Sequence, residues 1–122
     1  MNAPVSMQID NTEFVSDESI KPGPNNLPYW RMIARLTASG WTAASLSVQG
    51  SNDGTNWYPI YDNDKVGGAG YVGGATPSHL YSMVFRVPAC FTQYRLWSHN
   101  GSGTDVAQGG NRAFTVYVEQ SL

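Results

Sequence analysis

Residues 41–62 carry the pattern that most constrains this fold, because two alternating segments flank one Asp-Gly pair. In residues 43–49 apolar and polar side chains alternate, which predicts a strand with one apolar face and one polar face. The pair Asp53-Gly54 follows, and it is typical of a turn because glycine reaches positive φ at little cost. Alternation resumes over residues 57–61, so the whole segment predicts a β-hairpin.

Four other segments alternate in the same way, at residues 29–36, 80–87, 93–98 and 114–119. A short helix is the competing interpretation for the first of them. Six short strands with turn signals between them, and no convincing helix, favour a single all-β domain built as an antiparallel β-sandwich or barrel. The expected core combines Trp41 with the large apolar residues of these strands, namely Leu46, Val48, Trp57, Ile60, Phe85, Leu96, Phe114, Val116 and Val118.

Proline punctuates the start of the chain, at Pro4, Pro22, Pro24 and Pro28. Because proline lacks a backbone N–H, this stretch is neither a helix nor a central strand, with room only for a short edge strand at residues 12–15. We therefore expect an N-terminal arm at residues 1–28, draped over a partner subunit or left flexible, before a β-sandwich domain at residues 29–122. The glycine-rich residues 62–78 are too long for a turn, so they predict a functional loop or one ordered by outside contacts.

Composition limits the classes of partner. The net charge is −2 and the basic residues are scattered, so no nucleic-acid partner is expected. No apolar run approaches the roughly 20 residues of a membrane helix, and no secretory signal is expected at the N-terminus. The single cysteine, Cys90, cannot form an intrachain disulfide and is expected to be a small buried hydrophobe in a protein made in the cytoplasm. A weakly charged surface favours a subunit that packs against neighbours.

Catalytic and metal chemistry are not favoured by the sequence. His79 and His99 are the only histidines and are expected in polar loops, where nearby Ser and Asp residues occur by chance. Oxygen ligands suit calcium, but the spacing fits no known loop motif. The candidate ligands are Asp53, Asp62, Asn63 and Asp64. Turn chemistry already accounts for Asp53. We therefore expect neither an enzyme, nor a bound metal, nor a cofactor.

Aromatic and arginine side chains are the candidates for partner contact. The aromatics that could contact a protein partner or stack on a glycan, if exposed, are Trp30, Tyr58, Tyr71 and Trp97. A slip of one residue in the strand register would reverse the face of each strand residue among them. The arginines that could form a stripe are expected to pair with carboxylates or carbonyls instead, and they are Arg31, Arg35, Arg86, Arg95 and Arg112.

The hairpin and a later strand resemble a known family. Ser51-x-Asp53-Gly54-x-x-Trp57, followed by Tyr94-Arg95-Leu96, resembles the core of discoidin-type (coagulation-factor type C) jelly-rolls, although those domains are longer and many carry a cysteine pair. The chain is also similar, over residues 30–120, to small proteins of tailed bacteriophages and prophages. The matching stretches are residues 41–62, 94–104 and 106–116, and the departures are a glycine-rich insertion at residues 65–78 and a longer loop after Trp97.

The second resemblance implies a function. It implies a jelly-roll-like virion structural protein, made in the host cytoplasm, that decorates the assembled capsid by binding the major capsid protein. Its motif residues, read as structural, are Ser51, Asp53, Gly54, Trp57, Tyr94, Gln108 and Arg112. We expect Arg112 to close the last loop through its fork of donors, and a homo-oligomer, a trimer by analogy with capsid three-fold positions. The alternatives are a carbohydrate-binding module for host adhesion and a tail or neck accessory subunit.

Overall fold

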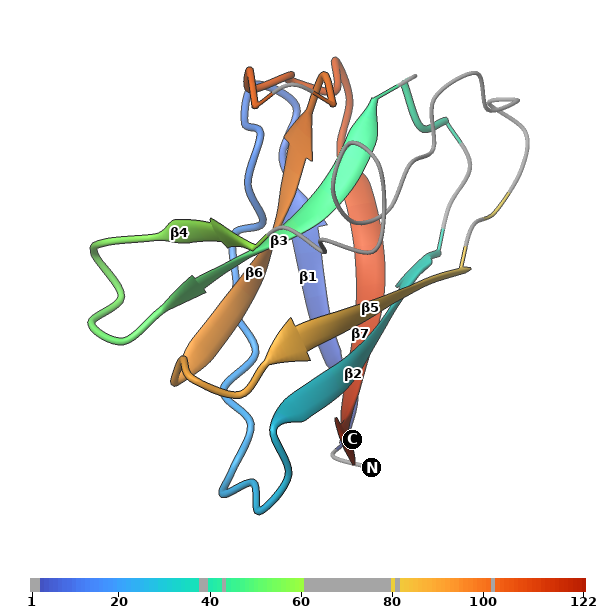
Figure 1. The fold of residues 1–122 in the computed structure, drawn as a ribbon. Coiled ribbons are helices and arrows are strands. Elements are labelled where there is room, and N and C mark those ends of the chain that lie inside the picture. The colour runs from blue at the N-terminus through green and yellow to red at the C-terminus, as the bar shows by residue number, and fades with distance from the viewer. Residues whose placement is uncertain (1–2, 38–39, 43, 61–79, 81, 102) are drawn as a thin grey trace.

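Seven strands in two antiparallel sheets form the described part of the molecule (Figure 1). The computed structural model describes residues 3–37, 40–42, 44–60, 80, 82–101 and 103–122. The strands are β1 (Val5–Ile9), β2 (Tyr29–Leu36), β3 (Ser45–Ser51), β4 (Tyr58–Ile60), β5 (Ser82–Pro88), β6 (Gln93–His99) and β7 (Arg112–Ser121). The predicted all-β antiparallel sandwich is confirmed, and residues 29–36 form a strand and not a helix. The predicted glycine-rich loop at 62–78 lies outside the described residues.

One core fills the space between the two sheets. The larger sheet has the order β1-β7-β2-β5 and the smaller one β4-β3-β6. Met32 faces Phe85 and Val118 in the larger sheet, and Val48 faces Ile60 and Leu96 in the smaller one. Eight of the nine strand residues named for the core are buried, as is Trp41, because strand alternation sends them to the inner faces. Trp57 is the exception.

The N-terminal segment is extended, as predicted, but it is part of the sandwich, so the predicted boundary at residue 28 is wrong. The first strand lies at Val5–Ile9, not at 12–15, and pairs with β7. Residues 14–20 then run along β6, where Ile20 and Tyr94 exchange backbone hydrogen bonds of 2.8 and 3.0 Å. Side chains of Met7, Ile9 and Ile20 enter the core. The segment is held because it covers strand edges that would otherwise expose unpaired backbone groups.

Candidate functional site

The motif residues of the hairpin organise the loop between β3 and β4. Ser51 Oγ accepts a hydrogen bond from the backbone N–H of Gly54 at 2.9 Å. Asp53 Oδ1 accepts from the N–H groups of Thr55 and Asn56 at 2.9 and 2.8 Å, and these bonds hold the pKa of Asp53 well below its usual range. Gly54 takes a φ of +75°, which favours glycine. The predicted hairpin therefore exists, but its connection is a loop of residues 52–57 that consumes the motif's polar groups internally.

Trp57 lies outside the core, contrary to the prediction. Its side chain is half-buried, its Nε1–H donates to the carbonyl of Gly54 at 3.1 Å, and the Arg95 guanidinium carbon lies 4.2 Å from a ring centroid. Arg95 Nε donates in turn to Gln49 Oε1 at 2.8 Å. Positions 57 and 60 are an odd number of residues apart, so a strand sends them to opposite faces, and Ile60 takes the core position.

The other motif residues fasten the scaffold. Gln108 is 1% exposed; its Oε1 accepts from Thr42 N–H at 2.7 Å and its Nε2 donates to Ser98 Oγ at 3.1 Å. Arg112 donates through Nε to Gln108 Oε1 at 3.3 Å and through a terminal nitrogen to the Gln108 carbonyl at 3.2 Å. Tyr94 donates its hydroxyl to the carbonyl of Pro88 at 2.6 Å, and burial raises its pKa to about 12. The motif therefore maintains the fold and presents no reacting groups.

His99 lies buried in β6, not in a polar loop as predicted, and His79 lies outside the described residues. The Nδ1 atom of His99 accepts a hydrogen bond from the backbone N–H of Gly101 at 3.0 Å, so the neutral imidazole carries its proton on Nε2. That N–H donates to Ser47 Oγ at 2.6 Å. Because His99 donates to Ser47, it is not placed to remove the serine proton, and this pair lacks the arrangement of an activated nucleophile. Burial lowers the pKa of His99.

Of the four aromatics predicted to contact a partner, only Tyr58 is shown to be exposed. Trp30 is 4% and Trp97 2% exposed, and Tyr71 lies outside the described residues. The register was predicted correctly for Trp97, which does point outward from β6. It is nevertheless covered, because it stacks on His99 with centroids 4.1 Å apart and donates through Nε1 to Asp105 Oδ1 at 2.6 Å.

Tyr58 and Phe91 form a surface that we call the aromatic end. Tyr58 is 57% exposed, and its ring stacks on Phe91 with centroids 6.1 Å apart and an interplanar angle of 19°. Phe91 is braced edge-on by Tyr94, and it lies over Gly50, where a Cβ would come within 2.3 Å of the ring. The neighbouring Cys90 is exposed, which corrects its predicted burial; it sits in the turn between β5 and β6, outside any strand.

A second surface, which we call the arginine face, is the outer face of β5, β2 and β7. Three rows cross these strands in register: Pro88, Tyr29 and Ser121, then Arg86, Arg31 and Glu119, then Val84, Ile33 and Tyr117, with Arg35 in the row that follows. Arg86 lies over the Tyr29 ring with its guanidinium carbon 3.6 Å from the centroid, and Arg35 lies 5.3 Å from the Tyr117 centroid.

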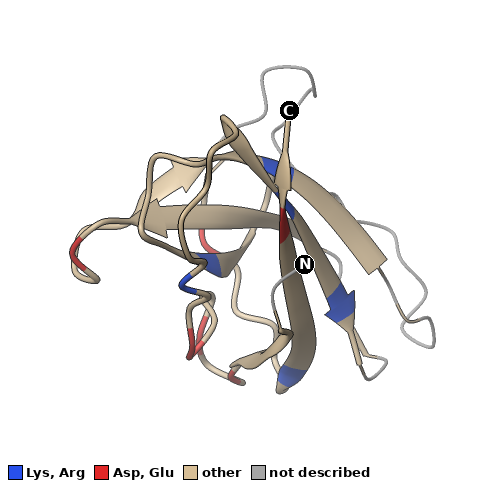
Figure 2. Cartoon of the chain, turned by 90° about the horizontal axis from the view of Figure 1, so that it is seen from below, with Lys and Arg blue, Asp and Glu red and all other residues tan. Residues whose placement is uncertain are grey.

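The sequence located the arginine face only in part. Of the five arginines considered for a stripe, three lie on this face, whereas Arg95 is on the smaller sheet and Arg112 is the first residue of β7 and bonds the loop before it. The alternation of residues 29–36 placed Arg31 and Arg35 together, but only the pairing of β2 with β5 adds Arg86. In Figure 2 several basic segments lie on strands, whereas the acidic segments lie mainly on loops.

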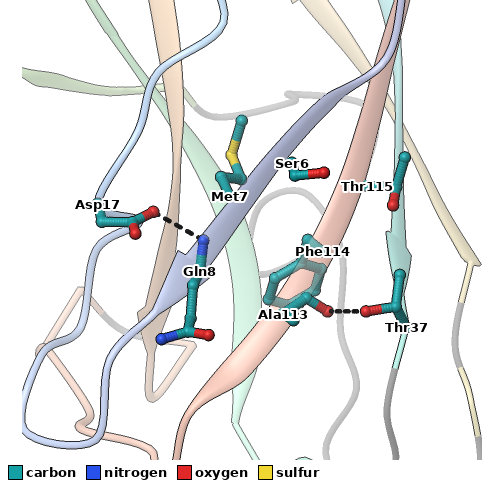
Figure 3. A pocket seen from close by; sticks show the side chains of 8 residues that line it. All are labelled: Ser6, Met7, Gln8, Asp17, Thr37, Ala113, Phe114 and Thr115. Atoms are coloured by element: carbon teal, nitrogen blue, oxygen red, sulfur yellow. Dashed lines mark hydrogen bonds between the residues drawn. The ribbon is translucent and has the colours of Figure 1, made fainter.

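A shallow depression of about 240 Å³ lies over β1 and β7, next to the arginine face (Figure 3). Its polar groups bond one another: Asp17 Oδ1 accepts from Gln8 N–H at 2.8 Å, and Thr37 Oγ1 donates to the Ala113 carbonyl at 3.1 Å.

Within the described ranges no cluster of His, Cys, Asp and Glu could hold a metal ion, and Asp53, the one described member of the predicted ligand set, bonds its own loop. Nor does that part of the chain contain a helix that could cross a membrane.

Comparison with known proteins adds no relative. No family model, no curated protein and no solved structure matches this chain. The arrangement of the described side chains therefore has to be interpreted on its own chemistry. It offers two exposed surfaces built from residue types that are enriched at protein interfaces, the aromatic end and the arginine face.

Proposed function

We propose that this protein is a structural subunit of a tailed-bacteriophage virion, which binds the outer surface of the assembled capsid and stabilises it without catalysing a reaction. The sequence resemblance to small phage proteins supports the virion role. The structure is compatible with it because the shared motif residues maintain a rigid β-sandwich and leave the contact surfaces to other side chains.

The observation that carries the proposal is the preorganised aromatic end. Tyr58 is 57% exposed, Phe91 lies near-parallel to its ring, and Phe91 itself packs edge-on against Tyr94. A tyrosine held in this way loses little conformational freedom on binding, and aromatic anchors of this type dominate the binding energy of many protein interfaces. The proposed partner is the major capsid protein, with Tyr58 inserted at its surface.

A carbohydrate-binding module is the alternative that the same ring suggests. Such a module is expected to present two or more coplanar aromatics beside polar groups. Among the described residues the near-parallel ring beside Tyr58 is Phe91, which is half-buried, and the rings of Tyr29 and Tyr117 lie under arginines. The geometry therefore favours a protein partner. A tail or neck position would use the same surface and differs in where the protein binds on the virion.

The test is co-sedimentation of the purified protein with capsids that lack it, followed by heat or low-salt challenge of the loaded capsids. We expect saturable binding with a fixed copy number and greater resistance of the capsid. Tyr58→Ala should weaken binding by about tenfold or more, as for an interface anchor, whereas Tyr58→Phe should retain it because the ring remains.

Leu80→Ala is the matched control, since Leu80 is 64% exposed and lies outside the aromatic end. Its binding should equal that of the unmodified protein. Absence of binding to capsids would overturn the proposal, and binding to tail fractions or to a glycan array would identify which alternative replaces it. Equal binding by Tyr58→Ala and the unmodified protein would show that the aromatic end is not the contact.

A further inference from the structure

The connection between β1 and β2 opens with an acidic stretch, residues 10–20, that we call the acidic connection. It contains Asp10, Glu13, Asp17 and Glu18 and neither Lys nor Arg. The two aspartates accept hydrogen bonds from Gln8. The carboxylates of Glu13 and Glu18 are exposed and make no ion pair or side-chain hydrogen bond with any described residue.

The arginine face has the opposite imbalance. It holds three arginines and one acidic side chain, Glu119, which forms a salt bridge of 2.5 Å with Arg31. Arg31 also stands directly opposite Arg86 across the strand pair, and like charges in that position repel each other. Arg86 lies flat on Tyr29 and donates through Nε to the Leu122 carbonyl at 3.4 Å, which leaves its terminal in-plane N–H donors available to carboxylates.

The two surfaces lie toward different edges of the larger sheet. The acidic connection runs outside β1, where Asp17 N–H donates to the Gln8 carbonyl at 2.8 Å. Arg31 and Arg86 lie on β2 and β5, beyond β7, in the sheet order β1-β7-β2-β5. The carboxylates of one molecule are therefore displayed on a different side from its own surplus arginines.

We propose that the arginine face binds the acidic connection of a second copy of this chain. Charge complementarity points to this occupant: within the described residues Glu13 and Glu18 have no Lys or Arg partner, and Arg35 and Arg86 have no Asp or Glu partner. Between the arginines, Val84 is 46% exposed and Tyr117 is half-buried, and these two side chains supply the apolar centre; Ile33, which lies between them, is 7% exposed. Two different surfaces meet, so the contact is heterologous, and its repetition builds a ring where the rotation closes and a filament where it does not.

This contact does not require a capsid, so it stands or falls separately from the proposed function. The experiment measures the mass of the full chain by light scattering or sedimentation at salt concentrations from about 0.05 M to about 1 M, over which the Debye length falls from roughly 14 Å to about 3 Å. We expect an oligomer at low salt that dissociates at high salt, because exposed charge pairs are screened.

Charge reversal identifies the two surfaces. Arg35→Glu with Arg86→Glu should give a monomer, and so should Glu13→Lys with Glu18→Lys, each with an unchanged circular dichroism spectrum. The variant that carries all four changes has both surfaces reversed, so it should assemble again. Lys21→Glu, which reverses an exposed charge outside both surfaces, should leave the oligomer intact.

Three results would overturn the proposal. The unmodified chain being monomeric at low salt would show that no such contact forms. An oligomer that ignores both salt and the arginine substitutions would place the interface elsewhere. Failure of the fourfold variant to assemble, although folded, would show that the two surfaces do not meet each other. If the arginine substitutions abolish binding to capsids or to single-stranded DNA while the chain stays monomeric, the face has a different occupant.

Discussion

The outer faces of the two sheets come from the same alternating pattern and have opposite environments. On the smaller sheet, outward residues such as Ser47, Trp97 and His99 are at most 2% exposed. On the larger sheet, the outward residues Arg31, Arg86 and Val84 are exposed to solvent, and Ile33, which lies among them, is 7% exposed. Alternation therefore determines which face a side chain occupies, and it does not determine whether that face is covered.

The difference lies in what else packs on each face. On the smaller sheet Trp97 and His99 stack on each other, Asp105 bonds the indole, and Trp57 packs on Arg95. Among the described residues the arginine face carries no comparable cover; its arginines lie on its own tyrosines. A covered outer face contributes to stability, whereas an open one is free to bind a partner.

The largest change in the free energy of unfolding is expected when an aromatic side chain is truncated on each of the two faces. Trp97→Ala removes a buried indole and should lower the free energy of unfolding by about 3–5 kcal/mol, because a cavity remains. Tyr117→Ala removes a half-buried ring from the open face and should lower the free energy of unfolding by only about 1 kcal/mol. Urea denaturation measures both. Equal losses would show that the two faces are equally packed.

The next effect concerns the loop that follows β6. Gln108→Ala leaves the Thr42 N–H without its acceptor and removes the side-chain acceptor of Arg112 Nε, so the free energy of unfolding should fall by about 1–3 kcal/mol. Gln120→Ala is the matched control, because Gln120 is exposed and donates one hydrogen bond to the Pro24 carbonyl. Thermal melting of the two variants compares them. Arg112→Ala with unchanged stability would contradict the closing role assigned to Arg112.

The free energy of unfolding should depend on pH through His99, which lies on the covered face. Burial lowers the pKa of His99 below its ordinary value of 6.5, so the unfolded chain binds the proton more readily than the folded one. The stabilising contribution is therefore full above pH 6.5 and is lost as the pH falls from there through the lower pKa of the folded state. Denaturation as a function of pH measures it. His99→Gln should remove this component, and its persistence in that variant would assign it to other groups.

The smallest effect is expected on the open face. Arg35→Ala and Val84→Ser change exposed side chains and should alter the free energy of unfolding by no more than about 0.5 kcal/mol. The same denaturation assay serves for both. A loss comparable to that of Trp97→Ala would mean that these side chains support the fold, and the face would then be structural.

Much of the fold follows from local alternation. Residues 93–98 and 114–119 alternate so clearly that their inward residues, including Leu96, Phe114 and Val116, are predicted correctly. The N-terminal strand was missed because its five residues lie in a proline-rich stretch, and its place is decided by the free edge of β7, over 100 residues away in sequence. Trp57 departs from the predicted core because it lies three residues before Ile60, and the period of two sends only Ile60 inward.

By itself, the sequence determined the strand faces, the loop chemistry of Ser51, Asp53 and Gly54, and the all-β class, because these depend on neighbours a few residues apart. Only the tertiary structure decided exposure: which aromatic stays open, that Trp97 and His99 are covered, and that Arg86 joins Arg31. Exposure depends on segments that meet from distant parts of the chain, and a local pattern contains no information about which segment will cover a given face.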